Sequence, residues 1–259
     1  MKILAPTRRR LIMTGAAASV GGLLLPGCDR LSEAPTFRRF LDSAETLNLH
    51  AQRLLIGQRL AREFAANQIS PTFRTNGTDL PPSPAYQAMA QAGFAGWKLR
   101  VDGLVGRPLD LSLDQLKALA ARSQITRHDC VEGWSAIGKW TGVPLAAVLR
   151  QAGLGPGARY IVFHCADSMD GQAQGTDFYY ESIDLIDAFH PQTILAYALN
   201  DRPIEVGHGA PLRLRVERQL GYKQAKYIMR VEAVSNLSRL GKGRGGFWED
   251  QGYEWYAGI

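Results

Sequence analysis

One stretch of the sequence combines the residue types that bind metals and attack electrophiles. Residues 127–135 read Arg-His-Asp-Cys-Val-Glu-Gly-Trp-Ser, with Cys130 at the centre. Cationic neighbours lower the pKa of a thiol and favour the thiolate, which is the form that coordinates a metal or acts as a nucleophile. We therefore expect Arg127 and His128 to act on Cys130. A buried structural cysteine is the alternative, because free cysteines are among the most buried residues.

Three further segments carry basic or amide side chains in glycine-bearing loops. Residues 207–213 contain His208 and Arg213, and a guanidinium fork beside backbone amides suits an anionic partner such as phosphate. Residues 221–226 add two lysines, and residues 73–77 form a loop that ends in Asn-Gly. Each of these segments taken alone is also compatible with an ordinary connector or hairpin.

The elements that must position these segments are short strands mixed with scattered helices. Period-two alternation predicts strands over residues 97–101, 160–164, 212–216 and 227–234. Helical periodicity and caps predict helices over residues 47–64, 109–122, 142–153 and 182–189. This mixture indicates an α+β fold rather than a regular βαβ array.

Length and composition bound the organisation. A chain of 259 residues with 46% hydrophobic residues fits a domain with a sizeable core. We expect a signal over residues 1–28, a linker over 29–46 and a single domain over 47–259. The net charge is +6, but residues 1–28 hold four basic residues and no acid. The remainder therefore has no nucleic-acid footprint, and no nucleic-acid partner is expected.

The N-terminal segment has the features of an export signal. Residues 7–13 contain a twin-arginine pattern, and a weakly hydrophobic run follows it. The twin-arginine route exports folded proteins, commonly with a cofactor inside, so we expect a periplasmic protein. Residues 25–28 resemble a lipobox in which Cys28 would carry a lipid tether to the membrane, and an uncleaved anchor is the alternative. Cys130 and Cys165 would then remain, and an exported pair could form a disulfide.

Together the four segments resemble the sulfite oxidase family of molybdopterin-dependent oxidoreductases, from about Phe73 to Tyr253. The order and spacing of several motifs carry the resemblance, since each short motif alone is weak. The matching stretches are the cysteine motif at 127–135, the segment 140–145, a His-Gly-x-Pro-x-Arg pattern at 208–213 and a Gly-x-x-x-x-Lys pattern at 221–226. The resemblance implies a sulfite-oxidase-like molybdopterin-binding fold of mixed β-sheets with flanking helices.

The resemblance also implies a role for each matching residue. Cys130 would give its thiolate to molybdenum, a soft ligand for a metal already held by the dithiolene of a pterin. Tyr253 falls where sulfite oxidases carry an active-site tyrosine. The residues expected to contact the molybdopterin are Arg74, Thr75, Asn76, Cys130, Asp167, His208, Arg213, Gln224, Ala225 and Lys226. Asp170 competes with Asp167 for the position of the cofactor-contacting acid.

Two departures from the family pattern bear on the substrate. Sulfite oxidases carry arginines that hold the sulfite anion where this chain has Thr75 and Ser135, which argues against sulfite. The compact, exported form is more similar to the catalytic subunits of bacterial protein-methionine-sulfoxide reductases. That group, however, carries asparagine at the position of His208.

The function that the resemblance implies is a periplasmic molybdenum-cofactor oxidoreductase. It would transfer an oxygen atom to or from a small or protein-bound S- or N-oxide or an anion. Electrons would pass to or from a haem- or cytochrome-type partner, because no Cys-x-x-Cys-His motif occurs in the chain. The alternatives are a sulfite dehydrogenase-like oxidation and a non-catalytic cofactor-binding lipoprotein. A cysteine hydrolase with Cys130 and His208 is disfavoured, since it leaves Arg213 and Lys226 without a role.

Overall fold

The computed structural model describes residues 34–172 and 177–259, in two compact units that divide after Gly57. The first unit contributes one described helix, α2 (Pro35–Ile56). The helix ends there because Gly57 adopts a φ of 56°, and its N–H donates to Arg53 O at 3.0 Å. The predicted helix over 47–64 and linker over 29–46 are therefore wrong in their bounds. The twin-arginine pattern and Cys28 lie outside the described residues.

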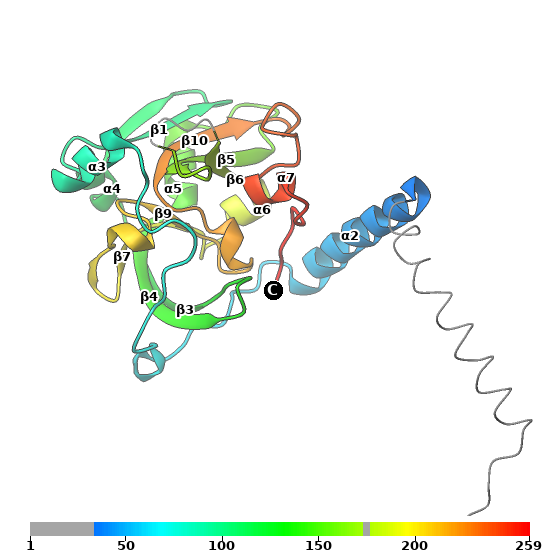
Figure 1. Ribbon diagram of the computed structural model, residues 1–259, viewed down its shortest axis with the longest axis horizontal. Helices are drawn as coiled ribbons and strands as arrows, with labels where there is room; N and C mark the ends of the chain where they lie inside the picture. The colour runs from blue at the N-terminus through cyan, green and yellow to red at the C-terminus, as the bar shows by residue number, and fades with distance from the viewer. Residues whose placement is uncertain (1–33, 173–176) are drawn as a thin grey trace, which may run out of the picture. The chain divides into compact units, whose positions relative to one another are not determined.

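Two β-sheets form the second unit, Gln58–Ile259 (Figure 1). The first sheet has the order β2 (Leu109–Ser112), β1 (Lys98–Gly103), β10 (Ile228–Val234), β5 (Tyr160–Ser168) and β6 (Phe178–Asp184). The second has the order β3 (Arg122–Asp129), β4 (Ser135–Pro144), β7 (Ile194–Leu199) and β8 (Arg202–Pro203), and β9 (Arg213–Arg215) also pairs with β7. Only β1 and β10 pair in parallel among the described strands, so the first sheet is mixed.

Short helices flank the sheets. They are α3 (Pro84–Gln91), α4 (Leu113–Lys117), α5 (Leu145–Ala152), α6 (Leu185–Ala188) and α7 (Phe247–Asp250), with 3-10 turns η1 (Ala66–Gln68), η2 (Val206–His208) and η3 (Gly221–Lys223). Mixed sheets with flanking helices confirm the predicted fold class. Over the described residues, no helix combines the length and apolar character that a bilayer crossing requires.

The predicted helix over 109–122 is wrong at both ends. The capping box is present, since Ser112 Oγ accepts from Gln115 N at 3.2 Å and Gln115 Oε1 accepts from Ser112 N at 2.8 Å. The residues before it form β2, because Leu109 and Leu111 alternate into the core while pairing with β1. Tertiary pairing here overrides a local helical pattern.

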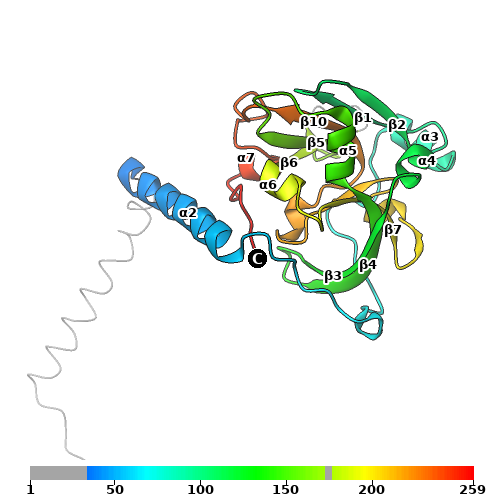
Figure 2. The ribbon, with the colours of Figure 1, turned by 180° about the vertical axis from the view of Figure 1, so that it is seen from behind.

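The main core lies between the sheets and around α5, which lies beside the first sheet in Figures 1 and 2. It includes Val101, Phe163 and Val231 from the first sheet and Val148 and Leu149 from α5, all of them at most 1% exposed. A second cluster surrounds Trp140 of β4. Burying each such apolar side chain contributes about 1.5–3 kcal/mol, and both sheets are thereby fixed beneath the loops that carry the motifs.

Gly142 marks the closest approach of β4 to β7. A Cβ there would lie 2.2 Å from Leu195 O and 2.6 Å from the Ala196 Cα, and neither backbone atom moves without disturbing the strand pairing. We expect Gly142→Ala to lower the free energy of unfolding by roughly 2–3 kcal/mol. Gly96→Ala is the matched control, because no atom lies within 4 Å of its added Cβ. Urea denaturation compares the two, and equal midpoints would contradict the close approach.

Candidate functional site

Cys130 directly follows β3, in a tight turn into β4. Its N–H donates to Trp134 O at 2.9 Å, and Gly133 N donates to Cys130 O at 3.1 Å, so the turn is closed by its own backbone. The thiol is free, 9% exposed, and lines a pocket of about 190 Å³. Cys165 is also free and is buried in the main core, so the alternative of a Cys130–Cys165 disulfide is wrong.

The charges at the Cys130 thiol differ from those expected. Burial raises the pKa of Cys130, and Arg213 is the cation that most opposes this. Arg127 instead pairs with Asp129 at 2.9 Å on the exposed face of β3. His128 points to the opposite face, where its Nδ1 accepts from Arg215 at 3.0 Å, and burial lowers its pKa well below the usual value. The expectation that Arg127 and His128 act on Cys130 is therefore wrong.

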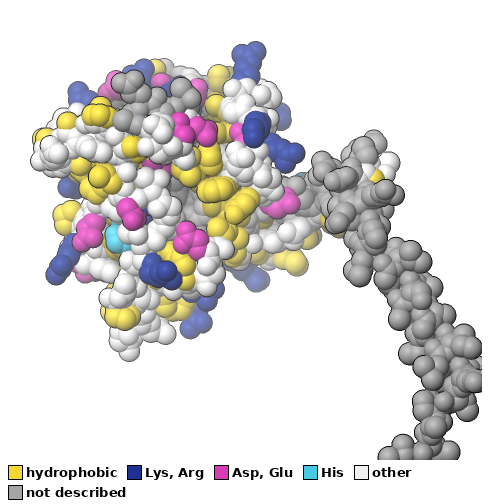
Figure 3. All heavy atoms as spheres, viewed as in Figure 1, with side chains coloured by type: hydrophobic (Ala, Val, Ile, Leu, Met, Phe, Trp, Pro, Cys, Tyr) yellow, Lys and Arg dark blue, Asp and Glu magenta, His cyan; other side chains and the backbone are white. Residues whose placement is uncertain are grey.

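The pocket is assembled from segments that are far apart in the sequence. Its lining residues are Asn76, Gly77, Thr78, Cys130, Val131, Glu132, Asp167, Met169, Tyr179, Gly221, Tyr222, Gln224, Lys226, Trp248 and Tyr253. Figure 3 shows apolar side chains gathered on the face that carries α7, with acidic side chains near them. Lys226 is the one basic residue among the described residues that line the pocket.

The structure divides the residues predicted from the sequence into two groups. Those that line the pocket are Asn76, Cys130, Asp167, Gln224, Lys226 and Tyr253. Those that lie outside its lining are Arg74, Thr75, His208, Arg213 and Ala225. Asp170 also lies outside, which favours Asp167 as the pocket acid.

Lys226 and His208 hold the loop that contains Asn76. The Lys226 ammonium donates to Asn76 O at 2.6 Å, Thr78 O at 2.5 Å and Gly207 O at 2.9 Å, which uses all three of its protons. His208 Nε2 lies 3.0 Å from Phe73 O and, as a donor, fixes the start of the same loop. Thr75 packs its methyl group over Gly207. Residues 73–78 are thus bound to both later motifs.

Arg213 is a buried cation without an acidic partner among the described residues. Its guanidinium is 0% exposed, donates to His208 O at 3.0 Å and Gln224 O at 3.4 Å, and leaves Nε without a partner. It lies over the Trp140 ring at 5.1 Å. Burial and neighbouring Arg215 lower the pKa of Arg213 to about 9. Buried charges are ordinarily paired, so this site favours an added anion.

Asp167 is a buried acidic residue of the same pocket. The side chain lies at the end of β5 and is 4% exposed, and its Oδ1 has no hydrogen-bond partner in the described structure. Burial raises the pKa of Asp167 to about 6. Burial and Arg213 lower the pKa of Lys226 to about 7. The pocket therefore contains two groups that change charge near neutral pH.

Sequence reasoning missed several residues of this site. Met169, Tyr179, Tyr222 and Trp248 line the pocket, and Lys223 lies behind it in a buried ion cluster with Glu181 and Glu249. Tyr222 and Lys223 lie inside the 221–226 motif, so their position was available from the sequence. For Tyr179 and Trp248, the only indication in the sequence was that the segments around them are rich in aromatic residues.

A comparison with known families and proteins gives a consistent result. A model described as the oxidoreductase molybdopterin binding domain matches residues 86–239. The chain is 36% identical over 258 residues to a putative protein-methionine-sulfoxide reductase subunit, YedZ1, of Azospira oryzae, an alignment that covers 98% of this chain and 88% of that protein.

Two further matches cover a smaller share of this chain. The protein-methionine-sulfoxide reductase catalytic subunit MsrP of Xanthomonas campestris is 36% identical over 173 residues, 64% of this chain and 52% of that protein, so the chain spans about half the length of this relative. The sulfane dehydrogenase SoxCD from Paracoccus pantotrophus matches with a TM-score of 0.48 at 21% identity, over 54% of this chain and 38% of that chain.

The family model covers more than half of the chain, and the Azospira relative is similar along almost all of it. Both agree with a fold of mixed sheets that gathers the cysteine, histidine–arginine and lysine motifs at one place. The chain therefore belongs to the family of oxidoreductases with a molybdopterin-binding domain, which confirms its resemblance to the sulfite oxidase family and makes it a molybdopterin-dependent enzyme.

Proposed function

We propose that this enzyme reduces methionine sulfoxide in proteins, with molybdopterin as its cofactor and Cys130 as the protein ligand of molybdenum. The observation that carries the cofactor assignment is the buried Arg213 without a carboxylate, behind a pocket that contains a free thiol. The substrate assignment is supported by the relatives from Azospira and Xanthomonas, which are named as protein-methionine-sulfoxide reductase subunits.

The residues present fit an anionic, polar cofactor. Arg213 Nε, Asp167 Oδ1 and Gln224 Oε1 are buried polar atoms without partners in the described structure. The set thus includes both a hydrogen-bond donor and hydrogen-bond acceptors. A ligand with phosphate oxygens and ring N–H groups would supply partners for both. Three further residues complete the set. Asn76 lies in the loop that borders the site, and His208 and Lys226 hold that loop in place. In this proposal Ala225 contributes its backbone, since its side chain is in the core.

Reduction of a sulfoxide consumes two electrons and two protons and yields a sulfide and water. Molybdenum, when bound, supplies the two-electron chemistry that oxygen-atom transfer requires. The two protons must be delivered by side chains of the protein itself. Asp167, with a pKa of about 6, holds a proton at its carboxyl in mildly acidic solution and lines the same pocket as Cys130.

The site disfavours sulfite. Thr75 packs on Gly207, and Ser135 Oγ donates to Asp129 at 2.5 Å, so neither position offers a cation. The ammonium of Lys226 is already bound to three carbonyls. A pocket with an aromatic side and an occupied lysine suits a neutral oxide better than a dianion.

A cysteine hydrolase receives no support from the geometry. The Nε2 atom of His208 lies 3.0 Å from Phe73 O, and its Nδ1 lies 3.8 Å from Glu205 Oε2. Both ring nitrogens thus face groups other than Cys130. A general base must lie within hydrogen-bond reach of the nucleophile that it activates.

The proposal places the enzyme in the periplasm, exported by the twin-arginine route, with a lipid tether at Cys28. The support is the pattern in residues 7–13 and 25–28 of the sequence. A haem- or cytochrome-type protein would supply the electrons, since the chain contains three cysteines and no haem-attachment motif.

Metal content tests the cofactor and its ligand. Protein purified from a host that makes molybdopterin should contain close to one molybdenum per chain. We expect Cys130→Ser to abolish the spectroscopic signature of a molybdenum–cysteine bond and to lower activity at least roughly a hundredfold, because the soft thiolate is lost. The buried Cys165→Ala is the matched control and should retain both. A folded wild type without molybdenum would refute the cofactor assignment.

Substrate turnover tests the reaction. With reduced viologen as electron donor, we expect the holoenzyme to reduce free and peptide-bound methionine sulfoxide. With an electron acceptor, it should oxidise sulfite at no significant rate, because the pocket lacks the two arginines. Sulfite oxidation at a typical enzymatic rate of about 1–1000 per second would show that Thr75 and Ser135 do not exclude that anion.

Asp167 should make stability depend on pH in a defined direction. Its folded pKa of about 6 lies above the unfolded value of 3.8, so its protonated form favours folding. This contribution is complete below the unfolded pKa and is lost as the pH rises through 6. Relative to Asp167→Asn, the cofactor-free wild type should lose on the order of 3 kcal/mol between pH 4 and 7. Urea unfolding at several pH values measures this, and parallel curves would contradict the assignment.

A further inference from the structure

Three aromatic residues form one continuous side of the pocket. Tyr253 lies between Trp248, stacked at 5.4 Å with an interplanar angle of 30°, and Tyr222, edge-on at 5.2 Å and 88°. All three line the pocket that Cys130 also lines. We refer to Tyr222, Trp248 and Tyr253 as the aromatic wall. Trp248 and Tyr253 lie outside the span that the family model matches, residues 86–239.

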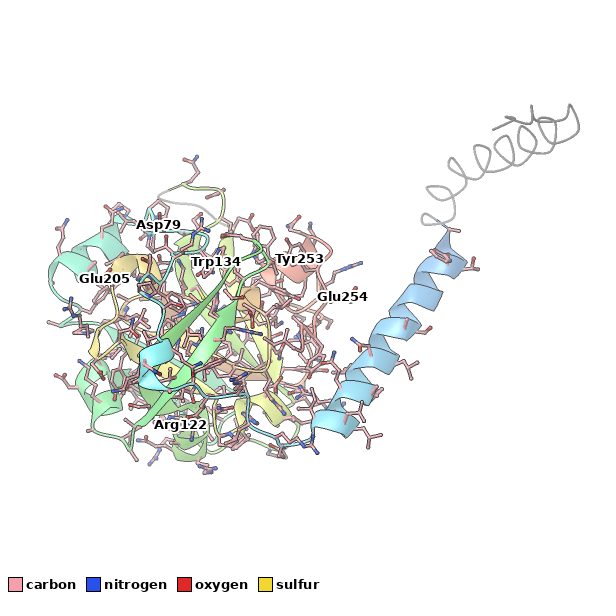
Figure 4. The ribbon with its side chains drawn as sticks, turned by 90° about the horizontal axis from the view of Figure 1, so that it is seen from below. Asp79, Arg122, Trp134, Glu205, Tyr253 and Glu254 are labelled. Carbon is pink, nitrogen blue, oxygen red and sulfur yellow. The ribbon has the colours of Figure 1, made fainter. Side chains whose placement is uncertain are left out.

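Two members of the wall are tyrosines, and one of the two hydroxyls is bound to the backbone. The Tyr222 hydroxyl donates to Glu254 O at 2.6 Å and is thereby directed to the tail backbone. Tyr253 is 41% exposed, so its ring is available to a ligand rather than enclosed by the core. Figure 4 shows Tyr253 next to Glu254 in the tail of the chain.

A tight turn after α7 folds Tyr253 back onto Trp248. Tyr253 N and Gln251 N both donate to Trp248 O at 3.0 Å. Gly252 has a φ of 106°, a conformation that side chains with a Cβ rarely adopt, so glycine is needed to reverse the chain here. Asp250 joins this turn to the preceding loop by accepting from Lys242 N at 2.7 Å and from the Tyr180 hydroxyl.

Behind the wall lies a fully buried ion cluster of Lys223, Glu181 and Glu249, which we call the buried triad. The Lys223 ammonium donates to Glu181 and, at 2.5 Å, to Glu249. Burial raises the pKa of Glu181 well above its usual value, because the charged carboxylate loses its hydration there. The pairing of the Lys223 ammonium with both carboxyls makes the cluster tolerable in the interior.

The triad connects the elements that carry the wall. Lys223 is the neighbour of Tyr222 in η3, and Glu249 is the neighbour of Trp248 in α7. Glu181 lies two residues from Tyr179, which also lines the pocket, on the same face of β6. The Lys223 ammonium, bound to both carboxyls, thus fixes η3, α7 and β6 relative to one another. Each of these elements carries an aromatic residue that lines the pocket.

We propose that the aromatic wall is the substrate-recognition surface for the alkyl groups on a sulfoxide sulfur, and that the buried triad positions it. This inference rests on the proposed function and adds the residues that determine specificity. Aromatic rings attract polarizable sulfur and the carbon atoms beside it, by about 0.3–1.5 kcal/mol for each contact. Such a surface accepts a neutral dialkyl sulfoxide at the end of a flexible side chain and offers nothing to a compact anion.

The ring of Tyr253, rather than its hydroxyl, is what the wall requires. In holoenzyme assays with peptide methionine sulfoxide and reduced viologen, Tyr253→Phe keeps the ring and should raise KM far less than Tyr253→Leu does. Tyr253→Leu and Trp248→Leu should raise KM about tenfold with little change in kcat, and tenfold corresponds to about 1.4 kcal/mol. Phe178→Leu is the matched control, since Phe178 is an aromatic residue with 44% exposure that does not line the pocket.

Two results would overturn this inference. One is an unchanged KM in both leucine variants. The other is a tenfold or larger loss of kcat in Tyr253→Phe with an unchanged KM, which would assign the hydroxyl a role in the chemistry. The wild type separates these outcomes from the proposed function. If it reduces no sulfoxide, that function fails, whereas turnover that is insensitive to the wall removes only the inference.

The triad is tested through residues that do not touch the pocket. Glu249→Ala removes one partner of Lys223 and should raise KM several-fold, because α7 is no longer fixed. Glu249→Gln keeps the shape and a neutral acceptor for Lys223, and it should restore a KM close to that of the wild type. Molybdenum content confirms that each variant is folded and loaded. Equal KM values for the alanine and glutamine variants would show that the triad does not position the wall.

Discussion

The buried guanidinium of Arg213 is the constraint from which the rest of the site follows. Strand β9 places Arg213 and Arg215 over the same Trp140 ring, at 5.1 and 4.5 Å, inside a molecule that shields both from water. Arg215 is neutralised by Glu217 at 2.6 Å, but Arg213 has only backbone carbonyls as acceptors in the described structure. Such an arrangement is unfavourable without an anion and favourable with one, so the surroundings of Arg213 favour a bound anion.

The buried lysines have different hydrogen-bond partners, and each set of partners has a different structural effect. Lys226 gives its three protons to carbonyls of the loops around Asn76 and Gly207, so it orders the loops that face the cofactor. Lys223 has two carboxyl partners and connects the elements behind the aromatic rings. Arg213, by contrast, donates only to backbone carbonyls among the described residues. These two buried lysines therefore fix the loop around Asn76 and the elements that carry the aromatic wall.

The sequence was sufficient for the fold class and for the residues that short motifs carry. Cys130, Asn76 and Lys226 reach one pocket, although they are distant in the chain. The bounds of α2 and β2 could not be predicted, because local periodicity does not report which strand a segment will pair with. The charges at Cys130 were misassigned because strand alternation directs His128 and Arg127 elsewhere. Glu181 and Glu249 had no local signal, since only the folded chain brings them to Lys223.

The parallel pairing of β1 with β10 has a consequence for how the enzyme is made. β10 lies between β1 and β5, so the first sheet remains divided until residues 228–234 have been synthesised. The pocket likewise draws on segments from Asn76 to Tyr253. Contacts between such distant residues form late and slowly, because a long loop must close before they can stabilise anything. A nascent chain that has not yet reached β10 therefore has neither a complete first sheet nor all of the segments that line the pocket.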